Sequence, residues 1–93
     1  MEERVTGYVS TAHLDVAAFL LVRGYQIERT DWDGGTIIFV FRDPAGNGKA
    51  AISEFYKDAL VGASEYASAQ KRCRDLMWER RRGNGNGKYG NTR

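Results

Sequence analysis

The first run of apolar residues along the chain has the spacing of a helix. We expect an α-helix from Ala12 to Arg23, with Ser10 or Thr11 capping its start and Gly24 ending it. Apolar positions occur on nearly every side of this helix, which predicts either a central helix or a helix in a contact between subunits. The positions concerned are Leu14, Val16, Ala17, Ala18, Phe19, Leu20 and Leu21.

The next segment changes to the alternation that is typical of strands. We expect strands over residues 25–30 and 36–42, joined through Asp33-Gly34, which is a strong hairpin turn signal. The second strand is apolar on both faces, because Ile37, Phe39 and Phe41 alternate with Ile38 and Val40. A lone hairpin is only marginally stable. A helix, or the same hairpin from a second chain, must therefore cover the other face.

Two further helices follow the hairpin. Asp43-Pro44 breaks the strand, and an amphipathic helix is expected over residues 49–60. The third helix is expected over residues 64–82, with Gly83 as its stop. The inward stripe of the first of these helices is Ile52, Phe55, Tyr56 and Ala59, and that of the second is Tyr66, Ala69, Cys73, Leu76 and Met77.

These elements predict one small α+β domain over residues 1–82, in the order helix, strand, strand, helix, helix. Residues 83–93 are rich in Gly and Asn and predict a disordered basic tail that is dispensable for folding. About eighty residues make a small core. Because small domains are often completed by oligomerisation, we expect a homodimer that buries the first helix or the open face of the hairpin.

Composition also bears on the cellular location of the protein. The lone Cys73 excludes a disulfide within the chain, and no apolar run reaches the length of a membrane span. The N-terminal residues are acidic and lack the pattern of a signal peptide. We therefore expect a cytoplasmic protein without a membrane partner, in the host cytoplasm if the protein is encoded by a phage.

Charge is distributed unevenly along the chain. Residues 70–93 hold eight cations and two acids, a net charge of +6, whereas residues 1–69 hold six cations and ten acids, a net charge of −4. A basic helix that runs into a Gly/Asn tail favours a polyanion or an acidic partner surface.

Several motifs also carry a resemblance. They are Leu-x-x-Ala-Ala-Phe-Leu-Leu-x-x-Gly-Tyr from Leu14, Phe-Val-Phe-x-Asp from Phe39, an x-Phe-Tyr helix from Glu54, and Tyr-Ala-Ser-Ala-x-Lys-x-x-x-x-Leu from Tyr66. Over about residues 8–79 the chain resembles a family of short proteins of unknown function from phages and bacterial genomes. The resemblance implies a fold but no catalytic residues. Residues 80–93 lie outside its motifs.

Catalysis has little support in the sequence, and we expect neither an enzyme nor a cofactor or metal site. His13 is the only histidine, and a protonated imidazole in the first turn of a helix would oppose the helix dipole. Cys73 lies on an inward stripe, where a buried structural thiol is expected. The loop over residues 46–49 reads Gly-x-Gly-Lys before a helix, but the full phosphate-binding motif needs a further glycine and a Ser or Thr. A connecting loop is the favoured interpretation, and a weak anion site is the alternative.

The third helix has the strongest functional pattern. With the inward Cys73 at zero, its rotation of about 100° per residue puts Arg74, Trp78, Lys71 and Arg82 between about 100° and 180°. An exposed indole among cations suits stacking on a base while the cations hold phosphates, although such a residue can also pack against a neighbour. The predicted nucleic-acid contacts are Lys71, Arg72, Arg74, Trp78, Arg80, Arg81, Arg82, Lys88 and Tyr89.

Nucleic-acid binding by an accessory protein of phage or mobile-element type is therefore the leading hypothesis. The alternative is a protein-binding module, such as a phage inhibitor of a host enzyme or of an anti-phage defence complex. Its candidate contact is Trp32, which lies between two aspartates at the predicted hairpin tip. An acidic aromatic tip does not favour phosphate, so a displayed Trp32 indicates a protein contact.

Overall fold

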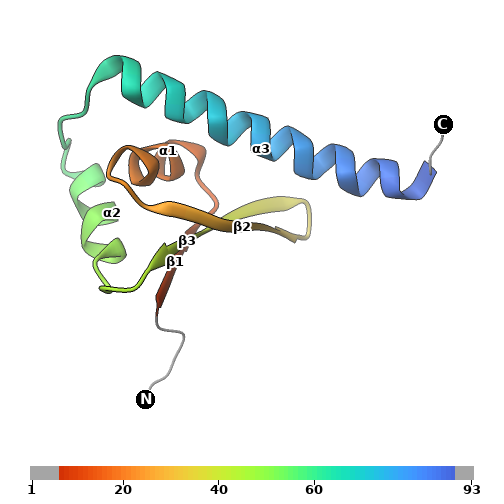
Figure 1. Cartoon of the computed structure of the whole chain (residues 1–93), viewed down its shortest axis with the longest axis horizontal. Coiled ribbons are helices and arrows are strands. Elements are labelled where there is room, and N and C mark those ends of the chain that lie inside the picture. Colours follow the sequence, from red (N-terminus) through yellow and green to blue (C-terminus); the bar gives the residue numbers. More distant parts are fainter. Residues whose placement is uncertain (1–6, 90–93) are drawn as a thin grey trace.

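The computed structural model describes residues 7–89, and it describes side chains up to Arg82. Three helices and a three-stranded antiparallel sheet form an α+β domain (Figure 1). Helix α1 lies between the sheet and the long helix α3, and α2 lies at one end of this arrangement. The elements are β1 (Gly7–Thr11), α1 (Leu14–Val22), β2 (Gln26–Asp33), β3 (Thr36–Asp43), α2 (Gly48–Tyr56) and α3 (Ala63–Tyr89).

The predicted succession of helix, hairpin and two helices is confirmed, and an additional strand precedes it. Strand β1 includes Ser10 and Thr11, which the sequence had suggested as helix caps. The residue at the N-cap of α1 is instead His13, whose side chain makes no capping hydrogen bond. The backbone N–H of His13 donates to Thr11 Oγ1 at 3.1 Å, so Thr11 orders the turn that leads into the helix.

Strand β3 is the middle strand of the sheet, in the order β1-β3-β2. Both neighbours are antiparallel to it, with Val9 and Ile27 each paired with Phe41. Directly paired residues share a face, so these side chains lie with Ile37 and Phe39 on the face that α1 covers. The hairpin turns at Gly34 and Gly35, whose φ angles of 58° and 93° suit the two-residue turn of a twisted hairpin.

Helix α1 is covered within a single chain. Val16, Ala17, Ala18, Phe19 and Leu20 are each at most 1% exposed. The sheet, α2 and α3 all contact this helix, which explains why its sequence is apolar on nearly every side. A second chain is not needed to bury α1, so this reason for expecting a dimer no longer applies.

The other face of the sheet is partly covered by its own side chains. Val40 is only 5% exposed, whereas Ile38 is half-buried. The Arg29 guanidinium lies 6.0 Å from the centre of the Tyr8 ring on this face. An open hollow of about 890 Å³ remains between the strands and the start of α2. The homodimer stays a prediction, and this face is the surface that still supports it.

Helix α2 is joined to the sheet by a compact junction. The Asp43 side chain is buried and accepts hydrogen bonds from the backbone N–H groups of Asn47 at 2.9 Å and Gly48 at 2.8 Å. This carboxylate therefore caps the start of the helix from the end of β3. The helix ends at Tyr56, earlier than the expected Leu60, and Asp58 then takes a left-handed φ of 62°.

Helix α3 lies across α1 with Ala69 and Cys73 buried against it. The Tyr66 hydroxyl donates to the backbone oxygen of Asp15 at 3.1 Å and ties the first turns of the two helices together. The helix continues past the expected stop at Gly83 to Tyr89. Glycine disfavours a helix interior by about 1 kcal/mol per residue but does not forbid it. Residues 90–93 of the predicted disordered tail lie outside the described residues, and its dispensability stays a prediction.

Candidate nucleic-acid interface on helix α3

Cys73 is fully buried and marks the inner side of α3, so the outer face of this helix is the side opposite to Cys73. At about 100° of rotation per residue, an outward sector from about 80° to 180° contains one aromatic side chain and four cations. Trp78 is near the centre of this sector and is 58% exposed. We call this sector the Trp78 face; its members are Lys71, Arg74, Trp78, Arg81 and Arg82, all exposed.

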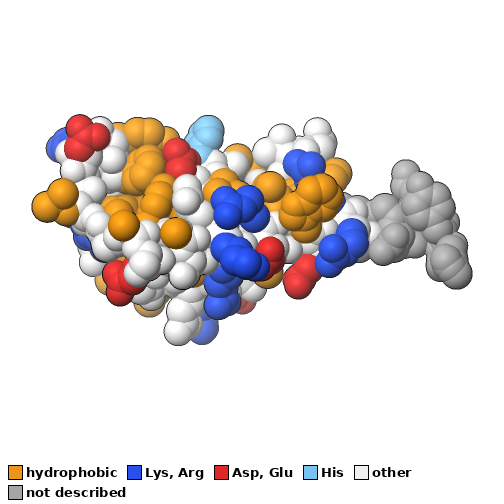
Figure 2. Space-filling model, turned by 90° about the horizontal axis from the view of Figure 1, so that it is seen from above, with side chains coloured by type: hydrophobic (Ala, Val, Ile, Leu, Met, Phe, Trp, Pro, Cys, Tyr) orange, Lys and Arg blue, Asp and Glu red, His pale blue; other side chains and the backbone are white. Residues whose placement is uncertain are grey.

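Carboxylates flank the Trp78 face on one side. Asp75 and Glu79 fall at about 200° and 240° on the same rotation. The Lys71 ammonium lies 3.0 Å from the Asp75 carboxylate, one turn away. Figure 2 looks down on α3 and shows Lys and Arg side chains gathered over its middle and C-terminal part. The face therefore combines an exposed indole with cations on both sides of it along the helix.

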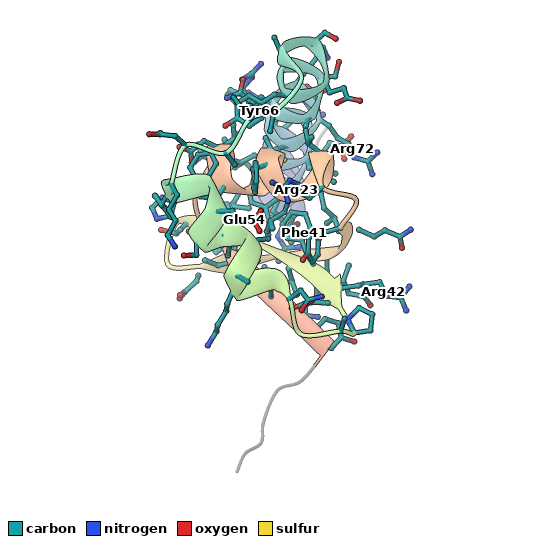
Figure 3. The ribbon with its side chains drawn as sticks, turned by 90° about the vertical axis from the view of Figure 1, so that its left-hand side faces the viewer. Arg23, Phe41, Arg42, Glu54, Tyr66 and Arg72 are labelled. Atoms are coloured by element: carbon teal, nitrogen blue, oxygen red, sulfur yellow. The ribbon has the colours of Figure 1, made fainter. Side chains whose placement is uncertain are left out.

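The other predicted contacts on α3 are placed differently. Arg72 is exposed on the flank beyond Glu79 and projects away from the body of the molecule (Figure 3). Arg80 is half-buried on the inner side, and its Nε atom is buried without a hydrogen-bond partner. Arg80 is thus not a member of the Trp78 face. Lys88 and Tyr89 belong to the helical backbone, but their side chains lie outside the described part of the chain.

Trp32 lies within β2 rather than at the hairpin tip. It pairs with Ile37, so its side chain is on the helix-covered side of the sheet, and it is 40% exposed. Its neighbour Asp31 is engaged by Arg29, with the Arg29 Nε atom 3.1 Å from the carboxylate. Trp32 therefore displays less of its ring than Trp78 does.

The loop before α2 does not leave its helix N-terminus free for an anion. The N–H groups of Asn47 and Gly48 both donate to the Asp43 carboxylate, which already occupies this position. The weak phosphate interpretation of Gly46 to Lys49 is thereby disfavoured. Among residues 7–89, no group of three or more His, Cys, Asp or Glu side chains could hold a metal ion.

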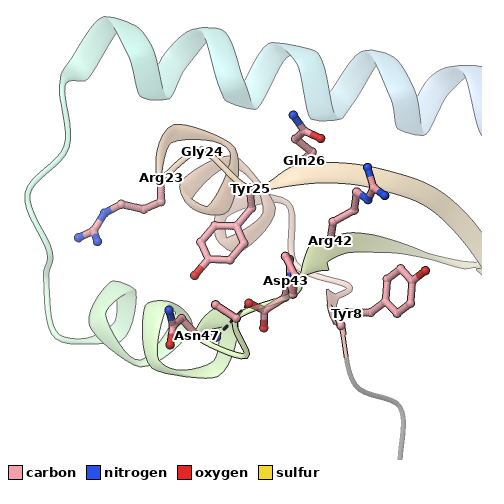
Figure 4. Close-up of a pocket in the computed structure, with 11 residues that line it drawn as sticks. Tyr8, Arg23, Gly24, Tyr25, Gln26, Arg42, Asp43 and Asn47 are labelled. Atoms are coloured by element: carbon pink, nitrogen blue, oxygen red, sulfur yellow. Dashed lines mark hydrogen bonds between the residues drawn. The ribbon is translucent and has the colours of Figure 1, made fainter.

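A second open cavity, of about 650 Å³, lies beside this junction and is lined by both apolar and polar groups (Figure 4). Its polar groups do not converge on one point. Arg23 points away from the cavity (Figure 4) and pairs with Glu54 at 2.7 Å, while Arg42 pairs with Glu28 at 3.4 Å. Partial burial, and then the nearby Asp43, raise the pKa of Tyr25. No acid–base pair suited to catalysis is assembled there.

Cys73 is a structural thiol. Burial raises its pKa from an ordinary value of 9.0 to about 11. At pH 8 we expect Cys73 to resist an aromatic disulfide reagent in the native protein and to react fully in denaturant, because the thiolate is the reactive form. The folding stability that comes from burying the thiol in its protonated form is fully present below pH 9, and it is lost as the pH rises through about 11. Rapid reaction of native protein at pH 8 would contradict this assignment.

The fold and this face define a small α+β protein with a basic, tryptophan-bearing helix surface. The chain belongs to the family described as Domain of unknown function (DUF5659), whose model matches residues 6–79. The match includes Trp78 and ends before Arg80. Searches of curated proteins and of solved structures find no match. No helix within residues 7–89 has both the length and the apolar character needed to span a membrane.

Proposed function

We propose that this protein is a small non-enzymatic accessory protein that binds nucleic acid through the Trp78 face of α3. The observation that carries the proposal is that Trp78 is 58% exposed at the centre of a cationic helix sector. Large exposed aromatic side chains commonly mark interaction sites. A base can stack on the indole while Arg74, Arg81 and Arg82 neutralise phosphates on either side.

The geometry favours single strands over duplexes. One exposed ring offers a stacking surface that an unpaired base can reach directly, whereas bases in a duplex are already stacked on each other. The cations lie about one helical turn before and after Trp78, so that a strand running along the helix axis keeps its phosphates near them. The proposal includes action in the cytoplasm, which the lone Cys73 supports, and an origin as a phage or mobile-element product, which the resemblance of the motifs supports.

The test is a titration of labelled single-stranded and duplex oligonucleotides at several salt concentrations. We expect a log–log salt slope of roughly −3 to −5 for about four to six neutralised phosphates. Trp78→Ala is expected to cost about 1–3 kcal/mol in binding, with the greater loss on single strands. Its thermal melt should match that of the wild type, because the indole is exposed.

Two triple variants separate a local contact from net charge. Arg74→Gln/Arg81→Gln/Arg82→Gln is expected to flatten the salt slope by about 2–3. The matched control, Arg42→Gln/Lys49→Gln/Lys57→Gln, removes the same charge from exposed positions elsewhere and should leave the slope nearly unchanged. Equal effects of the two variants, or no binding by the wild type at low salt, would refute the proposal.

The alternative function is binding of a host protein through Trp32. Its support is the 40% exposure of the Trp32 side chain on the hairpin. If the wild type binds neither DNA nor RNA at low salt, this alternative leads, and Trp32→Ala is the first variant to test against candidate host enzymes and defence complexes.

A further inference from the structure

An apolar surface lies at the end of the molecule opposite the basic half of α3. Leu60 is 94% exposed and Tyr56 is 64% exposed, beside the turn between α2 and α3. These two side chains and their neighbours Phe55, Ala59 and Val61 are called the end patch. The patch is larger than the isolated apolar residues that are normal on a surface. It is therefore a candidate docking surface.

A hollow of about 330 Å³ lies within the end patch. Aromatic rings form much of its wall: the centre of the Phe55 ring is 5.4 Å from that of Phe19 and 5.2 Å from that of Tyr56. This volume is at the small end of the range of about 300–1,000 Å³ for ligand pockets. It suits one large side chain of a partner. The lining residues are Phe19, Phe55, Tyr56, Asp58, Ala59, Val61 and Tyr66.

Two carboxylates lie beside the end patch, where the exposed Lys57 and the Arg23 guanidinium, paired with Glu54, are the neighbouring cations. Asp58 lines the hollow, and Glu65 lies over the α2–α3 turn, since a Cβ at Gly62 would be 3.0 Å from its carboxylate. Residues 7–69 hold five cations and eight acids, a net charge of −3, whereas residues 70–82 hold six cations and two acids, a net charge of +4. The molecule is thus polarised along α3, with the patch at one end and the cations toward the other (Figures 1 and 2).

We propose that the end patch binds the Trp78 face of a second copy of this chain in a head-to-tail contact. Leu60, Tyr56 and Trp78 are the three most exposed large apolar side chains among the described residues. They lie in surroundings of opposite charge, so one face complements the other. Trp78 enters the hollow, and the cations beside it approach Asp58 and Glu65.

This contact is heterologous, because it joins two different surfaces. Each added copy leaves one end patch and one Trp78 face free, so the assembly grows as short chains of molecules. The inference does not rest on nucleic-acid binding. Where both hold, a second copy and a nucleic acid compete for Trp78, and self-association regulates access to the nucleic-acid face.

Complementation between two variants tests the contact by sedimentation. Tyr56→Lys/Leu60→Lys removes the end patch and keeps the Trp78 face, whereas Arg74→Glu/Trp78→Ala does the reverse. The wild type is expected to rise above the 10.5 kDa chain mass with concentration and to return to it at high salt. Each variant alone should stay at the chain mass. An equimolar mixture should give a one-to-one complex and nothing larger.

Three outcomes would overturn the proposal. The first is a wild type that is monomeric at about 0.5 mM, a concentration at which even weak small interfaces are populated. The others are a dimer that persists in both variants and a pair of variants that fail to combine when mixed. Ala12→Lys, which adds a cation at an exposed position outside both surfaces, is the control and should associate like the wild type. Melting curves confirm that each variant folds. If the variants complement each other but the wild type binds no oligonucleotide, only the proposed function is refuted. If the wild type binds oligonucleotides but the variants do not complement each other, only this inference is refuted.

Discussion

Replacing Gly48 by alanine is expected to destabilise the domain by about 2–3 kcal/mol, through overpacking at the start of α2. A Cβ at this position would lie 2.6 Å from Val9 Cγ1, 2.7 Å from Val9 Cβ and 2.8 Å from Asp43 Oδ2. Neither neighbour can move freely, because Val9 is held in β1 and Asp43 is held by its two hydrogen bonds. The melting temperature should fall by about 10–20 °C for a domain of this size.

Gly62→Ala is the matched control for this substitution. There the new Cβ would meet the end of the Glu65 side chain at 3.0 Å, and a flexible carboxylate can rotate away. We expect Gly62→Ala to change the melting temperature by only a few degrees. A Gly48→Ala protein that melts with the wild type would show that β1 and α2 are not packed as described.

The second large effect is expected at Asp43, where alanine should cost about 2–3 kcal/mol of folding stability. The substitution leaves the N–H groups of Asn47 and Gly48 without their acceptor, and the Gly48 N–H is buried at this junction. Urea denaturation followed by circular dichroism measures the loss. The m-value should stay unchanged, since the surface exposed on unfolding is nearly the same.

Asp43→Asn separates the two hydrogen bonds. The amide keeps one acceptor oxygen but turns an NH₂ group toward the other backbone donor. Its stability is therefore expected to lie between those of the wild type and the alanine variant. A pair of variants that are both as stable as the wild type would mean that α2 does not depend on this cap.

The hairpin and the three helices could be predicted from local patterns, whereas β1 could not. Each helix shows a hydrophobic period within its own residues, and Asp33-Gly34 supplies the turn signal between the two strands of the hairpin. Strand β1 has five residues and only one buried side chain, Val9. Its partner Phe41 lies more than thirty residues later, so the strand is defined by a distant pairing. Ser10 and Thr11 also resemble helix caps in isolation.

The candidate surfaces, too, could be predicted from local patterns only in part. The exposure of Trp78 follows from the buried Cys73 because a regular helix fixes the angle between them. That geometry also places Arg80 inward, although composition alone groups it with Arg81 and Arg82. Tyr56 was expected on the inward stripe of a helix reaching Leu60. Because the helix ends at Tyr56, that stripe stops early and the side chain faces solvent.

The order of the layers sets the order in which the core can close during synthesis. The five buried residues of α1 leave the ribosome before α3 and before two of the three strands of the sheet that covers them. Strand β1 must wait for β3, and the side of α1 under Ala69 and Cys73 faces water until α3 has been made. A nascent chain that stops short of α3 thus has no complete core. The helix that closes this fold is also the segment with the net positive charge.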